Sequence, residues 1–72
     1  MSIFSEKLKT TRKQKNIKQK DLAQLMGLPL RTYQSYEYGE VEPNINGLIK
    51  LADYLDVSLD YLVGRSDDPT RH

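Results

Sequence analysis

Residues 19–38, with the sequence QKDLAQLMGLPLRTYQSYEY, decide the fold of this chain. They predict two short helices, one from residue 18 or 19 to residue 26 and one from about residue 29 to residue 38. Gly27 ends the first helix, because glycine adopts a positive φ without steric cost, and Pro29 suits the first turn of the second. The connection is too short for a long side-by-side hairpin, so we expect the two helices to cross at a steep angle.

The crossing divides each of these helices into an inner and an outer side. Ala23 lies at the predicted crossing point, where a small side chain permits close contact. The residues spaced to close the core beneath it are Leu22, Met26, Leu28, Tyr33 and Tyr36. The side chains left exposed on the second helix are Leu30, Arg31, Gln34 and Ser35. Three of these four can hydrogen-bond base edges, and a helix fits the major groove of DNA. The arrangement predicted is a helix-turn-helix.

Helical patterns continue on the N-terminal side of this stretch. Either Ser2 or Ser5 is a suitable N-cap for a first helix that runs to about Lys15. Its apolar face consists of Phe4, Leu8 and, less clearly, Thr11. Asn16 breaks this helix, and Ile17 then points back toward the core.

Two more helices are predicted on the C-terminal side. Asn44 is a good N-cap for a helix that ends near residue 55, and Ser58 caps a last short helix over residues 59–63, which Gly64 ends. The apolar stripe predicted for the longer helix is Ile45, Leu48, Ile49, Ala52 and Leu55. The sequence therefore predicts an all-α fold of five short helices in one domain, residues 1–64. The polar tail, residues 65–72, is expected to fray.

Charge is distributed unevenly along the 72 residues. Residues 1–38 carry eight basic and three acidic side chains, a balance of +5, whereas residues 39–72 carry three basic and seven acidic ones, a balance of −4. Such asymmetry is typical of a chain that turns one face toward an anion such as nucleic acid. The alternative is that the lysines form only a solvated face. The lysines in question are Lys13, Lys15, Lys18 and Lys20.

Composition argues against several other classes of protein. The chain has no cysteine, its N-terminus lacks the pattern of a signal peptide, and it has no apolar run long enough for a membrane helix. We therefore expect a soluble cytoplasmic protein without membrane association. The one histidine is His72 and no phosphate-cradling glycine loop is present, so we expect no enzyme activity, no cofactor and no metal.

From Phe4 to Gly64 the sequence resembles the phage-repressor and Cro-type helix-turn-helix family, also called the Xre family. The resemblance rests on the order and spacing of four motifs together. They are Leu8…Arg12, Gln19-x-x-Leu22-Ala23-x-x-Met26-Gly27, Tyr36-Glu37-x-Gly39…Pro43, and Leu48-x-x-Leu51-Ala52-x-x-Leu55-x-Val57-Ser58-x-Asp60-Tyr61-Leu62. The resemblance implies a five-helix, lambda-repressor-like fold and sequence-specific binding of double-stranded DNA. It also implies a transcriptional regulator, most often a repressor from a prophage or its host, that binds palindromic operators as a homodimer.

The resemblance also implies roles for single residues. It assigns Gln19 to the DNA phosphate backbone, and it pairs Arg12 with Glu37 in a partly buried ion pair between the first and third helices. Leu30, Arg31, Gln34 and Ser35 fall at base-reading positions, where arginine suits guanine and glutamine suits adenine. Further candidates for phosphate contact are Lys18, Lys20 and Tyr38. The candidate dimer contacts are Leu59, Tyr61 and Val63.

The sequence departs from the family pattern at three places. Pro29 occupies the position of the usual Ser or Thr cap, Tyr33 replaces a smaller aliphatic residue, and the loop at residues 40–42 is acidic where relatives usually carry Lys or Arg. This acidic loop and the acidic C-terminal half would also suit a basic protein partner. The alternative function is therefore that of a protein-interaction module, such as an antitoxin or adaptor, on the same fold. The five tyrosines could also serve as stacking platforms for single-stranded nucleic acid. Their helical spacing favours core and interface roles instead.

Overall fold

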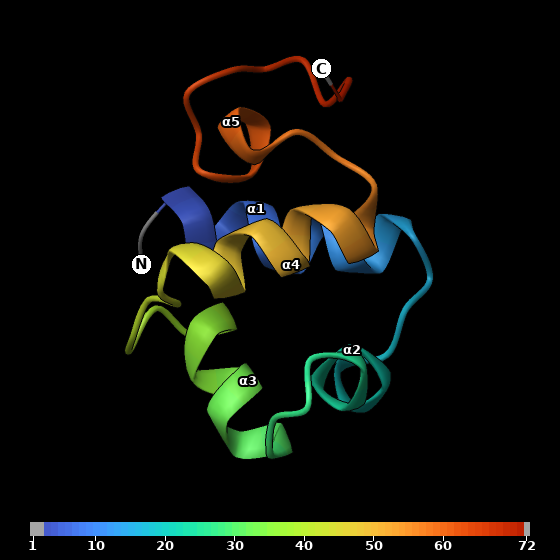
Figure 1. Ribbon diagram of the computed structural model, residues 1–72, viewed down its shortest axis with the longest axis vertical. Coiled ribbons are helices and arrows are strands. Elements are labelled where there is room, and N and C mark those ends of the chain that lie inside the picture. The colour runs from blue at the N-terminus through green and yellow to red at the C-terminus, as the bar shows by residue number, and fades with distance from the viewer. Residues whose placement is uncertain (1–2, 72) are drawn as a thin grey trace.

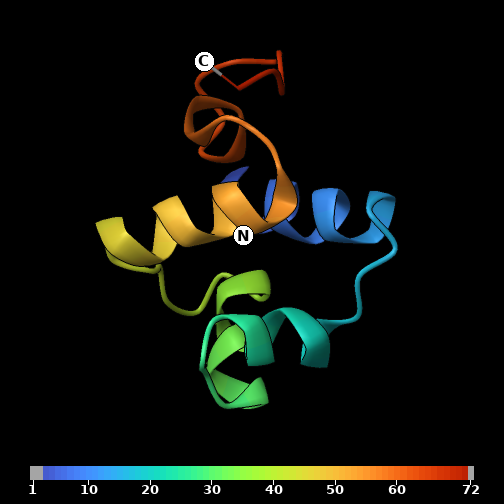
Figure 2. The same cartoon turned by 45° about the vertical axis from the view of Figure 1, so that its right-hand side comes forward.

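The computed structural model describes residues 3–71, and the regular elements among them are all helices. Their bounds are α1 Ile3–Gln14, α2 Gln19–Leu25, α3 Leu30–Glu37, α4 Ile45–Leu55 and α5 Leu59–Leu62. In both ribbon views α1 and α4 form a middle layer, α2 and α3 lie on one side of it, and α5 with the tail lies on the other (Figures 1 and 2). The predicted number and order of the helices are confirmed.

Helix α1 packs one face against the rest of the molecule, and a left-handed residue follows shortly after its end. Its buried residues are Phe4, Ser5, Leu8, Thr11 and Arg12. Ser5 lies inside the helix and is buried, so its predicted role as an N-cap is wrong, and Ser2 lies outside the described residues. Asn16 has a φ of 60°, a conformation that asparagine tolerates better than most residues, which explains why the helix stops there.

Helices α2 and α3 are joined as the sequence predicts. Gly27 has a φ of 70° and separates them. Pro29 takes the N-cap position of α3, which agrees with its place in the family pattern but lies just before the first turn of the helix, and no side chain caps this helix end. Leu22 and Ala23 hold the buried face of α2, whereas the side chain of Leu25 is 54% exposed.

Helix α4 is capped as predicted, but its buried face is rotated from the predicted stripe. The side chain of Asn44 accepts a hydrogen bond of 2.8 Å from the backbone of Gly47. Leu51 is fully buried, whereas Ile45 and Ile49 are 67% and 45% exposed. The residues that α4 turns inward are Leu48, Leu51, Ala52 and Leu55, which are spaced as one helical face.

The core lies between the layers and draws on every helix. Its buried hydrophobic residues are Phe4, Leu8, Leu22, Ala23, Tyr33, Leu51, Ala52, Leu55, Val57 and Leu62. Ser58 caps α5 by accepting a hydrogen bond of 3.0 Å from the backbone of Tyr61. No helix in residues 3–71 is long and apolar enough to cross a membrane.

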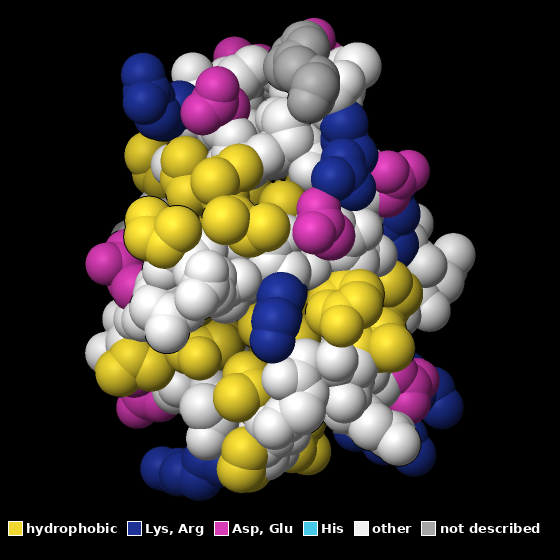
Figure 3. Space-filling model, viewed as in Figure 1, with side chains coloured by type: hydrophobic (Ala, Val, Ile, Leu, Met, Phe, Trp, Pro, Cys, Tyr) yellow, Lys and Arg dark blue, Asp and Glu magenta, His cyan; other side chains and the backbone are white. Residues whose placement is uncertain are grey.

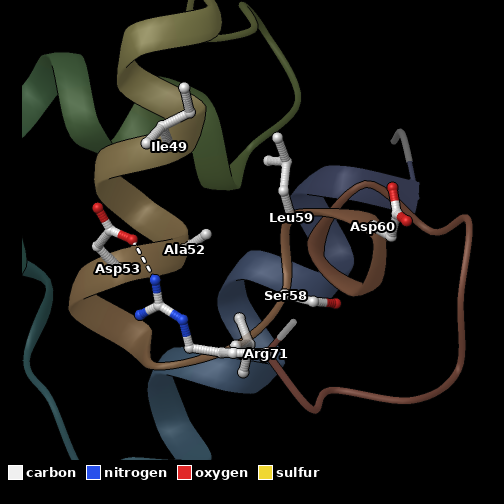
Figure 4. A pocket seen from close by; sticks show the side chains of 8 residues that line it. Ile49, Ala52, Asp53, Ser58, Leu59, Asp60 and Arg71 are labelled. Carbon is white, nitrogen blue, oxygen red and sulfur yellow. Dashed lines mark hydrogen bonds and ion pairs between the residues drawn. The ribbon is translucent and has the colours of Figure 1, made fainter.

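The C-terminal tail does not fray as predicted over its described part. The backbone of Ser58 donates a hydrogen bond of 2.9 Å to the carbonyl of Pro69. Arg71 forms an ion pair with Asp53 of α4, with Nη2 and Oδ1 2.5 Å apart, and lies within 3.7 Å of Asp56. This pair lies at a pocket of about 290 Å³ between α4, α5 and the tail (Figure 4). The tail is therefore held against α4 and α5, and the division of the chain at residue 64 stays a prediction.

Candidate nucleic-acid interface

Helix α3 is fixed to the domain by one side and presents the other to solvent. Tyr33 and Glu37 are both buried on the inner side, one helical turn apart. Leu30 is 42% exposed on the outer side, Arg31 is exposed, and Gln34 and Ser35 are half-buried. The predicted base-reading residues thus lie together on one helix whose opposite face is anchored in the core.

The anchor of α3 is an ion pair with α1. Arg12 Nε lies 2.5 Å from Glu37 Oε2, and Arg12 Nη2 lies 3.3 Å from Glu37 Oε1. A third nitrogen of the guanidinium, Nη1, donates to the backbone carbonyl of Ile17 at 2.7 Å. The structure therefore contains the ion pair between the first and third helices that the family resemblance implies.

Two more side chains complete the environment of the Glu37 carboxylate. The hydroxyl of Tyr33 donates to Oε2 at 2.5 Å, and the amide of Gln19 donates to Oε1 at 3.0 Å. Sequence reasoning missed both contacts. The presence of Tyr33 where relatives have a smaller aliphatic residue was the available signal, because a buried tyrosine hydroxyl needs a partner.

These contacts shift the ionisation of the buried groups. Burial disfavours the charged form of Glu37, but the hydrogen bonds from Arg12, Tyr33 and Gln19 outweigh it and hold the pKa of Glu37 below its ordinary value. Burial raises the pKa of Tyr33, and the hydrogen bond to Glu37 raises it further. Burial lowers the pKa of Arg12, but its contacts with Glu37 outweigh this effect and leave that pKa raised. Glu37 is therefore an anion whose partners are all donors.

The polar residues of the outer face are already partly engaged. Gln34 Nε2 donates a hydrogen bond of 3.1 Å to Oε1 of Gln19. The hydroxyl of Ser35 donates to the carbonyl of Thr32 at 2.6 Å, which leaves the Ser35 oxygen as an acceptor. Arg31 has no hydrogen bond or ion pair with the described chain, so its guanidinium donors remain available.

The candidate phosphate contacts lie at the two ends of the α2–α3 pair. Lys18 and Lys20 are exposed at the start of α2, and Tyr38 is 55% exposed directly after α3. The acidic loop follows: Glu40 and Val41 both donate their backbone N–H to the carbonyl of Ser35, at 3.0 and 3.4 Å. The loop is thus tied to the end of α3.

The candidate dimer contacts are only partly accessible. Leu59, Tyr61 and Val63 are half-buried and pack against the core. The ammonium of Lys7 lies 4.4 Å from the centroid of the Tyr61 ring, a cation–π contact that sequence reasoning missed. Hydrophobic side chains also gather in patches across the middle of the face shown in Figure 3, around α4.

Three of the five tyrosines take part in the core, as predicted, and two are exposed. Tyr33 is buried, Tyr36 meets it edge-on with ring centroids 6.3 Å apart, and Tyr61 packs on the core. Tyr38, a candidate phosphate contact, is exposed. Tyr54 is a second exposed tyrosine, and its hydroxyl donates to the carbonyl of Leu25 at 3.0 Å, which links α4 to α2.

Known sequences match this chain over most of its length. The helix-turn-helix family matches residues 8–62. The uncharacterized HTH-type transcriptional regulator YqaE of Bacillus subtilis is 45% identical over 92% of the chain. The cryptic phage CTXphi transcriptional repressor RstR of Vibrio cholerae is 42% identical over 86% of it. The chain spans 58% and 55% of the lengths of these two relatives.

Two solved structures share the fold. A transcriptional regulator from Listeria innocua is 39% identical, with a TM-score of 0.79 over 85% of this chain and 57% of that one. The P22 c2 repressor, solved in complex with a synthetic operator, is 29% identical, with a TM-score of 0.81 over 92% of this chain and all of that one. The predicted lambda-repressor-like fold is confirmed. The chain belongs to the helix-turn-helix family, and within it to the phage-repressor or Xre type.

Proposed function

We propose that this chain is a sequence-specific DNA-binding transcriptional regulator, and specifically a repressor, that inserts α3 into the major groove. The observation that carries the proposal is the two-sided construction of α3. Tyr33 and Glu37 fix its inner side to α1 and α2, and its outer side presents the residues with base-reading chemistry. A rigidly held helix with polar outer side chains is what readout of base edges requires.

Each outer side chain has a distinct chemical role in this proposal. Arg31 donates two hydrogen bonds to O6 and N7 of a guanine, and Gln34 pairs with an adenine. Leu30 offers an apolar surface to a thymine methyl group, and Ser35 accepts a hydrogen bond. Contacts with the phosphates, which carry no sequence information, come from Gln19, Lys18, Lys20 and Tyr38.

The proposal includes binding as a homodimer to a palindromic operator. One α3 covers only a few base pairs, so two half-sites about one helical turn apart supply specificity that a single helix lacks. Leu59, Tyr61 and Val63 are the proposed contacts between the two copies. The P22 c2 repressor, similar over its whole length, is a protein solved with an operator, and RstR is named a repressor, which supports the assignment.

The test is selection from a pool of randomised duplex DNA at moderate and high salt, followed by sequencing of the retained duplexes. We expect enrichment of a palindrome with half-sites about ten base pairs apart. Arg31→Ala should relax the preference at one position of each half-site, while Arg65→Ala, a change of an exposed arginine outside α3, should leave it intact. Binding that shows no enrichment and vanishes with salt would contradict sequence-specific readout. Absence of any binding would favour the protein-interaction module instead.

A further inference from the structure

The amide of Gln34 is held in one orientation by a chain of hydrogen bonds that begins at a buried carboxylate. Glu37 Oε1 accepts from Gln19 Nε2 at 3.0 Å, and Gln19 Oε1 accepts from Gln34 Nε2 at 3.1 Å. This series of hydrogen bonds leads from the core beneath α3 to the outer face of that helix. It joins Gln19 of α2 to two residues of α3, 18 positions away in the sequence for Glu37 and 15 for Gln34.

Each link in this chain has a fixed donor and a fixed acceptor. A carboxylate only accepts hydrogen bonds, so Gln19 must turn its NH₂ group toward Glu37 and not its carbonyl. Its carbonyl then faces Gln34, which must in turn present its own NH₂ group. Rotating either amide by half a turn would set two oxygens against each other. The acceptor character of Glu37 therefore decides which way the Gln34 amide faces.

We propose that Gln19 is a positioning residue that makes Gln34 read adenine in preference to guanine. This rests on the proposed function, since it names the base that one residue of that interface selects. With one N–H committed to Gln19, Gln34 retains its carbonyl oxygen and one N–H. These are the acceptor and the donor that N6 and N7 of adenine require.

Guanine does not fit the same amide. Its major-groove edge presents two acceptors, N7 and O6, so the Gln34 carbonyl would meet another oxygen. A glutamine that is free to turn can offer its NH₂ group to guanine instead. The hydrogen-bonded network therefore sharpens the preference for adenine that a glutamine side chain already has.

The experiment compares base preferences of variants of residues 1–72 in selections from randomised duplex DNA. The position that Gln34 reads is defined as the one whose preference disappears in Gln34→Ala. At that position the wild-type chain should prefer adenine over guanine about tenfold. Gln19→Met, which keeps the length of the side chain without its amide, should reduce this preference several-fold, because the freed Gln34 amide can turn its NH₂ group toward guanine. The preference of the position read by Arg31 should not change.

A matched control separates positioning from loss of a phosphate contact. Lys20→Ala should weaken binding to all sequences alike and leave the adenine preference at Gln34 intact. Retention of the full adenine preference in Gln19→Met would overturn the inference. A wild-type preference for guanine at this position would overturn it too, and so would a Gln34→Ala variant that changes the base preference at no position. If the wild-type chain enriches no sequence at all, the proposed function itself fails, which is a different result.

A measurement without DNA tests the same chain of hydrogen bonds. In ¹⁵N-labelled protein, Gln19→Met should move the side-chain amide resonances of Gln34, whereas Lys20→Ala should leave them in place. Circular dichroism of each variant verifies that it is folded. Gln34 resonances that stay unchanged in a folded Gln19→Met variant would contradict the inference.

Discussion

Glu37 of α3 and Arg12 of α1 lie 25 positions apart in the chain and form a buried ion pair, with 0% and 9% of their side chains exposed. Burial of two charges is costly unless their remaining hydrogen-bonding capacity is satisfied. Here Tyr33 and Gln19 supply the further donors to the carboxylate, and the carbonyl of Ile17 accepts from the guanidinium. Through Gln19, the pair that holds α3 in place is also linked to Gln34 on the outer face of that helix.

The first prediction concerns the loss of the carboxylate. Glu37→Ala leaves the guanidinium of Arg12 buried without its partner, and we expect the free energy of unfolding to fall by about 3 kcal/mol. Thermal and urea melts measure this loss. Glu40→Ala, which removes an exposed glutamate three positions later, should change the free energy by less than about 0.5 kcal/mol. Equal stability of the Glu37→Ala variant and the wild-type chain would refute a stabilising role for the pair.

The second prediction concerns acid. Because the pKa of Glu37 lies below its ordinary value of 4.5 in the folded chain, the unfolded chain takes up this proton at a higher pH than the folded one does. The stability that Glu37 contributes is therefore present above pH 4.5 and is lost as the pH falls through the folded pKa. Urea melts between neutral and acid pH should show the gap between the wild-type chain and Glu37→Gln closing over this range. A gap that stays constant would contradict the lowered pKa.

The third prediction concerns the hydroxyl of Tyr33. Tyr33→Phe keeps the buried ring but removes one hydrogen bond to the charged Glu37, and we expect a loss of about 2 kcal/mol in the free energy of unfolding. Tyr38→Phe is the matched control, because the Tyr38 side chain is exposed and makes no hydrogen bond with the described chain. If both variants unfold alike, the hydroxyl of Tyr33 does not contribute to stability.

The sequence predicted the fold well wherever a local signal determines it. Gly27 adopts the positive φ predicted for it, α1 ends just before Asn16 as predicted, and Asn44 and Ser58 cap their helices. Cap and turn signals act through neighbouring backbone groups, so they can be identified without knowledge of the tertiary structure.

The errors lie where tertiary packing decides. The predicted stripe of α4 included Ile45 and Ile49 and omitted Leu51, because an apolar helix offers more than one stripe and only its neighbours select which is buried. The tail was wrongly expected to fray. The ion pair that holds it, between Arg71 and Asp53, joins residues 18 positions apart, and no local pattern in the sequence indicates it.

The candidate site shows the same division. The outer residues of α3 were identified from their helical spacing, and the ion pair of Arg12 and Glu37 from the family resemblance. The contacts of Gln19 with Glu37 and Gln34 were missed, because they depend on how α2 crosses α3. The sequence predicted only that these two helices cross at a steep angle, which does not specify which of their side chains meet.

The last prediction concerns the proposed homodimer. Leu59 is half-buried at the edge of the pocket between α4, α5 and the tail (Figure 4), so a charge there would have to be desolvated when a second copy covers it. We expect Leu59→Glu to shift the chain from dimer to monomer in sedimentation equilibrium. Leu25→Glu, which places the same charge on an exposed leucine of α2, should leave the dimer intact.

Because Leu59 also packs on the core, circular dichroism must first show that the variant is folded. A folded monomer should then bind a single half-site and lose the preference for two half-sites about one helical turn apart. A folded Leu59→Glu chain that still sediments as a dimer would exclude this surface as the contact. In that case the exposed isoleucines of α4, Ile45 and Ile49, become the next surface to change.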